Sequence, residues 1–263
     1  MMEAKIRKPA VAGSFYAGDA KELRQDVLNC FSRCKNPLME NVQAVIVPHA
    51  GYVFSGVTAA SAFAAINPDA EYEHIFLLGP SHHVYLGKAS VNIGASAYAT
   101  PLGNVPVDTA LCKDLMEKSD AITYAPEAHE SEHCLEVELP FLQYHMKKMP
   151  SIVPIIIATQ ELTTLKKIAD TLKPYLNEKN LFVISSDFSH YPACKDAEIV
   201  DGLTKDSIMT GKVEAFVNAT LHNQELGIDH LATSACGMAP IATLLMMTEN
   251  DANIKPHHVM YCN

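Results

Sequence analysis

Short runs of apolar residues alternate along the chain with longer stretches in which apolar and polar positions follow a helical period. The runs are rich in β-branched residues and end at Pro, Gly or polar residues, a pattern typical of strands. They are too continuous for strands with one solvated face, so they predict a sheet covered on both faces. The expected strands are Gln43–Val47, His74–Leu78, Ser151–Ala158 and Leu181–Ser185, with Ala89–Ile93 and His257–Tyr261 as further candidates.

The stretches between these runs predict amphipathic helices. They are Gly56–Ala65, Thr109–Lys118, Leu135–Lys148, Glu161–Leu176, Ala197–Thr210, Val213–Leu221 and Ser234–Thr248. This alternation predicts an α/β fold, a three-layer α/β/α sandwich with a mostly parallel central sheet. No repeat, low-complexity tract or Gly/Pro/Ser-rich linker divides the sequence, so we expect residues 1–263 to form one domain.

Composition and net charge limit the kinds of molecule that this protein is expected to bind. The 263 residues are 48% hydrophobic and 19% charged, an ordinary globular balance. The formal net charge is −10 and no Lys/Arg cluster occurs, so we expect neither nucleic acid nor a membrane as partner, and expect a small molecule or peptide instead. No apolar run approaches the ~20 residues of a bilayer span, and the start lacks the apolar region of a signal peptide. Seven cysteines without a paired framework indicate a reducing, cytoplasmic location.

Histidines follow three of the expected strands, each at the C-terminal end. His49 lies in PHAGYVFSG after the first strand, His82 and His83 lie in GPSHH after the second, and Asp187 and His190 lie in SSDFSHY after the run LFVIS. Right-handed crossovers bring the C-terminal ends of parallel strands to one edge of a sheet, where ligands bind. A single histidine after a strand is usually an ordinary loop residue, but three at one edge predict a site.

Cys236, in SACG, is a fourth candidate because it lies near the expected start of the helix over 234–248. Free N–H groups and the helix dipole favour the thiolate there, which is the form that binds metals. The alternative is a small buried apolar side chain. Imidazoles with a thiolate suit iron(II), copper or zinc and do not suit magnesium or calcium. We therefore expect His49, His82, His190 and Cys236 to converge in a mononuclear metal site.

Residues 126–142, PEAHESEHCLEVELPFL, hold a further pair of candidates. The i,i+3 spacing of His133 and Glu136 places both on one face if a helix has begun, where they could orient a ligand histidine or hold substrate. The alternative is the acidic, solvated start of a helix, where Glu130 and Glu132 would also be favoured. The pattern leaves both interpretations open.

Five segments closely resemble, in this order, the motifs of the Memo-like family, whose bacterial and archaeal members are also called AmmeMemoRadiSam system protein B. The segments are PHAGYVFSG, GPSHH, ESEHCLEVELPFLQ, SSDFSHY and SACG, and the resemblance runs from KPAVAGSFY at residues 8–16 to the C-terminus. It implies a fold similar to the class III extradiol dioxygenases of the LigB type. Those enzymes hold a non-haem iron through two histidines and a carboxylate, with a further histidine as base.

Carried over motif by motif, the resemblance implies that His49, His82 and Cys236 are metal ligands. His190 matches the base, with Asp187 beside it. The family's cleft is associated with iron or copper and with redox activity, and eukaryotic members are described as binding phosphotyrosine-containing receptor peptides. A thiolate stands where the dioxygenases have a carboxylate, so the two-histidine, one-carboxylate triad is not reproduced. The resemblance in fold therefore does not imply ring cleavage.

Three functions follow from these residues. The first is a non-haem, dioxygenase-like redox protein containing iron(II) or copper. In it His190 exchanges a proton, and Asp187 either orients His190 or accepts hydrogen bonds behind the ligands. His83, His133 and Glu136 line the pocket or support its ligands. The second is a zinc-dependent hydrolase in which the metal activates water. The third is a module that binds a peptide or metabolite in the same pocket without turnover.

Overall fold

The computed structural model describes residues 5–34 and 38–263. Its strands are β1 (Lys5–Arg7), β2 (Ala44–Val47), β3 (His74–Pro80), β4 (Lys88–Val91), β5 (Ala95–Thr100), β6 (Gly103–Pro106), β7 (Ile122–Thr123), β8 (Ser151–Ala158) and β9 (Asn180–Ser185). Its α-helices are α1 (Ala20–Ser32), α2 (Tyr52–Ala64), α3 (Thr109–Lys118), α4 (Glu127–Glu130), α5 (Leu139–His145), α6 (Leu162–Leu172), α7 (Cys194–Met209), α8 (Val213–Glu225) and α9 (Met238–Thr248).

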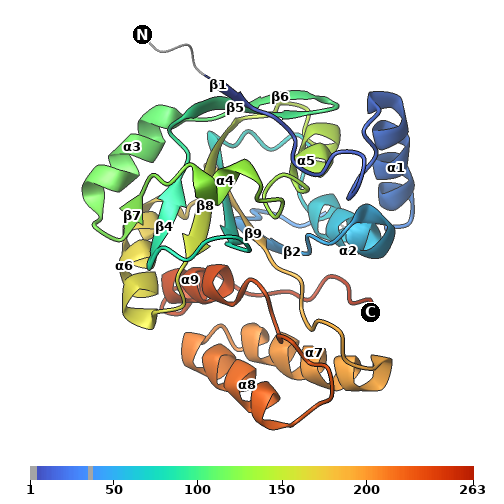
Figure 1. The fold of residues 1–263 in the computed structure, drawn as a ribbon, viewed down its shortest axis with the longest axis vertical. Coiled ribbons are helices and arrows are strands. Elements are labelled where there is room, and N and C mark those ends of the chain that lie inside the picture. Colours follow the sequence, from blue (N-terminus) through green and yellow to red (C-terminus); the bar gives the residue numbers. More distant parts are fainter. Residues whose placement is uncertain (1–4, 35–37) are drawn as a thin grey trace.

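The main sheet has the strand order β2-β9-β3-β8-β4-β7. The first four of these strands run parallel to one another, β4 pairs antiparallel with β8, and β7 pairs parallel with β4. The predicted α/β class is confirmed, and the mostly parallel sheet is mixed at one edge. A second, smaller sheet of order β1-β5-β6, which the sequence pattern did not predict, lies above it in Figure 1.

Helices cover both faces of the main sheet (Figure 1). The crossover from β2 through α2 to β3 runs one way along the sheet, and the crossover from β8 through α6 to β9 runs the other way. Because such connections are right-handed, α2 and α6 lie on opposite faces. Helix α9 joins α6 and packs on β3 and β9, while α1 and α5 pack against α2. Helices α7 and α8 pack against each other, and α8 also packs against α9.

Several expected elements differ from the structure. Residues 257–261 form no strand, since this segment is held by side-chain contacts to α2 and α7 rather than by a ladder. The helix expected over 135–148 is the shorter α5, and the one expected over 234–248 begins at Met238. Helix α1 was not predicted, although Asp19 caps it by accepting from the backbone N–H groups of its first turn.

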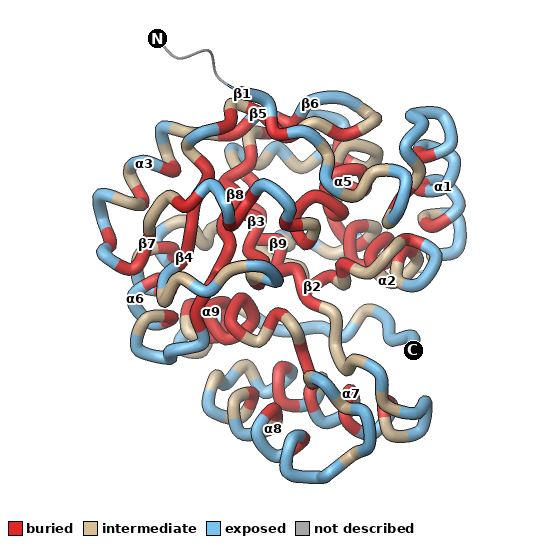
Figure 2. Tube along the Cα trace, in the orientation of Figure 1, coloured by how far each residue is buried: buried red, intermediate tan, exposed pale blue. Residues whose placement is uncertain are grey.

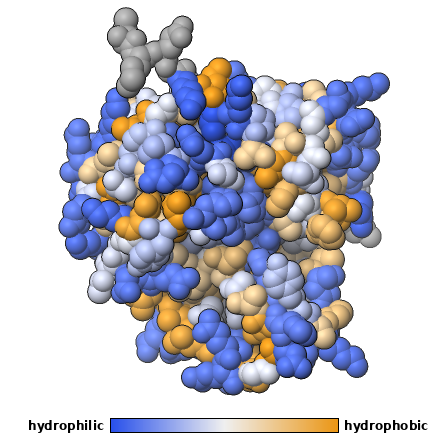
Figure 3. Space-filling model, viewed as in Figure 1, coloured by the Kyte–Doolittle hydropathy of each residue, from blue (hydrophilic) through white to orange (hydrophobic). Residues whose placement is uncertain are grey.

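Burial follows the layers. Strands β3, β4, β8 and β9 and helix α9 are buried along most of their length, whereas β2 at the sheet edge is half-buried (Figure 2). Polar side chains cover much of the face in Figure 3, with apolar patches scattered between them. Ile199 and Leu203 of α7 and Leu221 of α8 are exposed apolar residues. None of the helices within 5–34 and 38–263 combines the length and apolar character that a bilayer span requires.

Candidate metal centre

The candidate residues lie at the C-terminal ends of three neighbouring strands. His49, His82 and Asp187 each come two residues after the last residue of β2, β3 and β9, respectively. Because β9 lies between β2 and β3, these three ends are adjacent along the sheet. Cys236 approaches from the segment that leads into α9, whose helix packs on the same strands. The expected convergence at one edge is what the structure shows.

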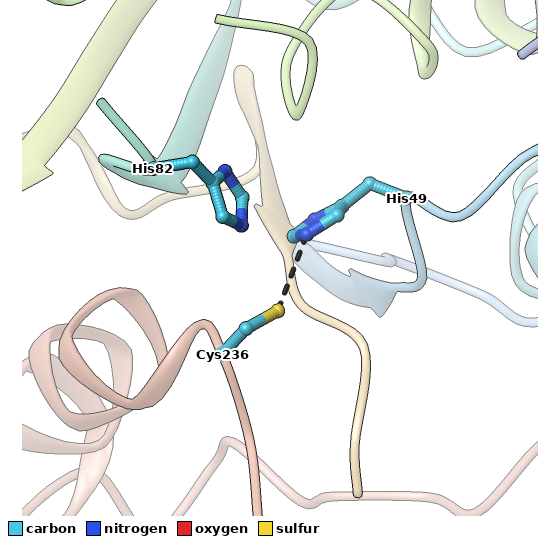
Figure 4. A group of neighbouring side chains, drawn as sticks. All are labelled: His49, His82 and Cys236. Carbon is cyan, nitrogen blue, oxygen red and sulfur yellow. Dashed lines mark hydrogen bonds between the residues drawn. The ribbon is translucent and has the colours of Figure 1, made fainter. Parts of the chain in front are cut away.

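Three potential ligand atoms meet there. The nearest side-chain ligand atoms of His49, His82 and Cys236 all lie within 4.8 Å of one another. Cys236 Sγ lies 3.2 Å from His49 Nε2, the contact drawn in Figure 4. The two imidazole rings have centroids 5.2 Å apart and stand at 83° to each other, edge to face. Two imidazoles and a sulfur around one point suit a soft or borderline metal ion.

Ser185 determines which nitrogen of His49 is free. The hydroxyl of Ser185 donates its hydrogen to the carbonyl oxygen of Cys134 at 2.7 Å. Its lone pairs therefore accept from His49 Nδ1–H, also at 2.7 Å. The proton of His49 is thus on Nδ1, and the lone pair of Nε2 faces Cys236. Metal-binding histidines are typically oriented in this way by a partner on the other nitrogen.

Glu132 does the same for His82. Its Oε1 accepts from His82 Nδ1 at 2.9 Å, and its Oε2 accepts from the His82 backbone N–H at 2.8 Å. Burial raises the pKa of Glu132, but the hydrogen bonds from His82 and Cys134 outweigh it, so the pKa lies well below its usual value. An ionised carboxylate only accepts, so His82 also carries its proton on Nδ1 and offers Nε2.

The protonation states at the centre follow from burial. Burial lowers the pKa of His49 to about 4 against the opposing effect of Asp187, so this imidazole is neutral and able to bind a metal at pH 7. Burial and Asp187 raise the pKa of Cys236 to about 12. The expectation that a helix N-terminus favours the thiolate is therefore wrong for the protein without a cation. Cys236 precedes the cap residue Gly237, and burial dominates.

Asp187 and His190 form a second group that shares Cys236. The ligand atoms of these three residues also lie within 4.8 Å of one another. Asp187 Oδ1 accepts from the backbone N–H groups of His49 and Ala50, while Oδ2 lies 3.9 Å from Nε2 of both His49 and His190. At 3.9 Å Asp187 and His190 are too far apart for a hydrogen bond, and the geometry allows His190 to be either a base or a ligand.

His133 and His83 differ in their relation to this cluster. The ring of His133 stacks on His82 with centroids 4.8 Å apart and lies 5.4 Å from the ring of His49, while Phe15 packs on it at 4.7 Å. His133 therefore forms a wall of the site. His83 is exposed beside His82, and it belongs to none of the metal-ligand groups found in the described residues.

Glu136 faces away from this chemistry. His133 and Glu136 lie in a turn between α4 and α5, so the helix face expected to carry both does not form. The buried carboxylate of Glu136 pairs with Arg7 at 2.6 Å and accepts from Tyr16 Oη and from the backbone N–H groups of Ala10 and Val11. Its oxygens are thus occupied by the N-terminal segment, where it has a structural role.

A groove of about 1710 Å³ gives access to the cluster. It is lined by His49, His82, His133, Asp187 and His190, and it continues along residues 253–263 of the C-terminal segment. A small molecule or an extended peptide can therefore reach the exposed edge of His82 from solvent.

Residues 7–263 match the family described as Memo-like protein. The chain belongs to the Memo-like family. A MEMO1 family protein of Nitrosopumilus maritimus is 31% identical over 97% of this chain and 92% of its own length. Another of Aeropyrum pernix is 34% identical over 98% of this chain and 93% of its own, and one of Schizosaccharomyces pombe is 37% identical over 72% and 62%.

Two residues of this Memo-like site were missed by sequence reasoning. Glu132 was interpreted as a solvated acid at a helix start, yet it is buried beneath His82. Ser185 was treated only as the end of a strand, yet it orients His49. The signal that could have found Glu132 is its place inside ESEHCLEVELPFLQ, one of the segments that carry the resemblance.

Proposed function

We propose that this Memo-like chain holds one redox-active metal ion, iron(II) or copper, on His49, His82 and Cys236, and acts with it on a small-molecule or peptide ligand in the groove. The observation that carries the proposal is the convergence of the three ligand atoms within 4.8 Å. The hydrogen bonds of Ser185 and Glu132 support it, because they turn the Nε2 lone pairs of both histidines toward the sulfur.

The donor set fits such an ion. Two imidazoles and one sulfur suit iron(II), copper or zinc. A cation at this point lowers the pKa of a thiol that binds it, so Cys236 would bind as the thiolate and release its proton. Bound there, iron or copper supplies Lewis acidity and one-electron redox chemistry.

Asp187 and His190 supply the proton chemistry in this proposal. His190 Nε2 accepts a proton from a ligand in the groove, and the carboxylate 3.9 Å away stabilises the imidazolium that results. His133 and Phe15 form an aromatic wall that limits water beside the cluster. All seven cysteines are free, which suits a reducing, cytoplasmic compartment in which Cys236 stays reduced.

The test is metal analysis of protein purified without oxygen, followed by reconstitution with iron(II), copper(I) or zinc. We expect about one equivalent of iron or copper in the wild type and at least a hundred-fold weaker binding in Cys236→Ser and His82→Ala. The matched control is His83→Ala, which removes the neighbouring exposed imidazole and should retain the metal.

Each other outcome contradicts the proposal in a recognisable way. Absence of iron and copper from both purified and reconstituted wild type would refute it. Full occupancy by zinc with no oxygen consumption indicates the hydrolase instead. A ligand affinity that Cys236→Ser leaves intact, in protein that has lost its metal, indicates a binding module.

A further inference from the structure

A buried carboxylate outside the metal centre joins two distant segments. Asp201 of α7 is 4% exposed. Its Oδ1 accepts from the backbone N–H of Ser189 at 2.9 Å, and its Oδ2 accepts from the hydroxyl of Tyr261, also at 2.9 Å. A buried carboxylate requires hydrogen-bond partners, and these two bonds engage both oxygens. One segment carries His190, and the other is the C-terminal segment that lines the groove.

Backbone hydrogen bonds hold the segment around His190. The next residue, Tyr191, has φ of 71° and is 80% exposed, so its own side chain does not keep it in this unfavourable conformation. His190 N–H donates to the carbonyl of Thr233 at 3.1 Å, and Ala232 N–H donates to the carbonyl of His190 at 3.2 Å. The hydrogen bond from the Ser189 N–H to Asp201 is a third such bond, at the residue directly before His190.

The C-terminal segment is anchored on both sides of Tyr261. Met260 Sδ lies 3.1 Å from the Ser61 hydroxyl on α2. The side-chain amide of Asn263 donates to the carbonyl of Cys194, where α7 begins, at 3.1 Å. Figure 1 shows this segment passing between the main body and α7. Tyr261 is therefore presented to Asp201 by contacts on either side.

We infer that Tyr261, acting through Asp201, is a positioning residue for His190. With Tyr261 in place, the carboxylate is aligned to receive the Ser189 N–H, and the adjacent imidazole is held 3.9 Å from Asp187. Without the hydroxyl, Oδ2 is a buried acceptor with no donor, so the carboxylate reorients and loosens the loop of His190. The inference rests on the proposed function only for the role of His190 in proton exchange.

The test compares Tyr261→Phe with Tyr72→Phe. The control removes a tyrosine hydroxyl that donates to the carbonyl of Val42 at 2.7 Å, a bond of similar kind elsewhere in the protein. Amide hydrogen exchange and nitrogen-15 spectra of the histidine rings are measured on metal-free protein. We expect about ten-fold faster exchange at Ser189 and His190 in Tyr261→Phe only. We also expect the ring signals of His190 to shift or broaden while those of His49 stay in place, which general destabilisation would not produce.

A second variant tests the route through Asp201. Tyr261→Phe should add little to the effect of Asp201→Asn on these amides, since both changes act on one network. Wild-type exchange and unchanged His190 ring signals in Tyr261→Phe would overturn the inference, as would an equal response to Tyr72→Phe. Because the measurements need no metal, their failure is separate from that of the proposed function, which is seen as missing metal in the wild type.

Discussion

Glu132→Gln is the most direct test of how this site prepares His82. The carboxylate accepts four hydrogen bonds, from Nδ1 and the backbone N–H of His82 and from the backbone N–H groups of His133 and Cys134. A glutamine oxygen can keep the three bonds at Oε1, without their charge. The NH₂ group of the glutamine then takes the place of Oε2, which in the wild type accepts from the His82 backbone N–H at 2.8 Å. Two hydrogen-bond donors would then face each other.

The magnitude follows from these contacts. Losing one bond to a charged acceptor and weakening three should lower the free energy of unfolding by roughly 2–4 kcal/mol. Loss of the negative charge also makes the His82 imidazole a weaker metal ligand. Changes to the hydrogen-bond partners of metal-binding histidines typically weaken metal binding about 10- to 100-fold. We therefore expect a folded protein with reduced affinity for iron(II) and copper.

The assay is anaerobic competition against a chromophoric chelator, with urea unfolding in parallel. The matched control is Glu130→Gln, the same change in an exposed residue at the end of α4. Because hydrogen bonding lowers the folded-state pKa of Glu132, its contribution is complete above the ordinary value of 4.5 and is lost as the pH falls below it. The difference in stability between wild type and Glu132→Gln should therefore narrow below that pH. Metal affinity within two-fold of wild type, in a background where His82→Ala abolishes binding, would refute this account of Glu132.

Two further changes probe the surroundings of the centre. Burial lowers the pKa of His129 from 6.5 to about 3, so the folded protein keeps this imidazole neutral while the unfolded chain protonates as the pH falls below 6.5. This difference should remove about 2 kcal/mol of stability between pH 7 and pH 5. In urea unfolding, His129→Gln should abolish that part of the pH dependence of stability, whereas the exposed His222→Gln should not. Wild type and both variants losing the same free energy of unfolding between pH 7 and pH 5 would contradict this account of His129. A Cβ at Gly237 would lie 2.6 Å from the carbonyl oxygen of the last residue of β9. Gly237→Ala should therefore lower the free energy of unfolding by roughly 1–3 kcal/mol. It should also displace the neighbouring Cys236 and weaken metal binding. Gly202→Ala, where no atom lies within 4 Å, is the control, and metal titration that does not distinguish the two variants would show that Gly237 is not needed.

Much of the site could be predicted because its signals are local. A β-branched run that ends in Pro, Gly or Ser marks a buried strand and its end, and His49, His82 and Asp187 all follow such runs. The handedness of crossovers then brings these ends together whatever the detailed packing. The α/β class and the convergence of the histidines follow from that rule, and both agree with the structure.

Other parts depend on contacts that no local pattern records. The partners of Glu136 in the N-terminal segment lie more than a hundred residues away, and so does the Asp187 carboxylate that meets the backbone of His49. Which carboxylate reaches His82 depends on how the turn after α4 packs, and the expected helix there would have left Glu132 in solvent.

The protonation of Cys236 shows the same division. Its place before a helix is visible in the sequence and indicates a thiolate, but the surrounding burial raises its pKa to about 12. A residue's identity and its local period are properties of the sequence, and they determined where the candidate ligands of this protein would gather. Desolvation and hydrogen bonding depend on which distant segments pack around each side chain, so only the tertiary structure decided how each candidate is oriented and protonated.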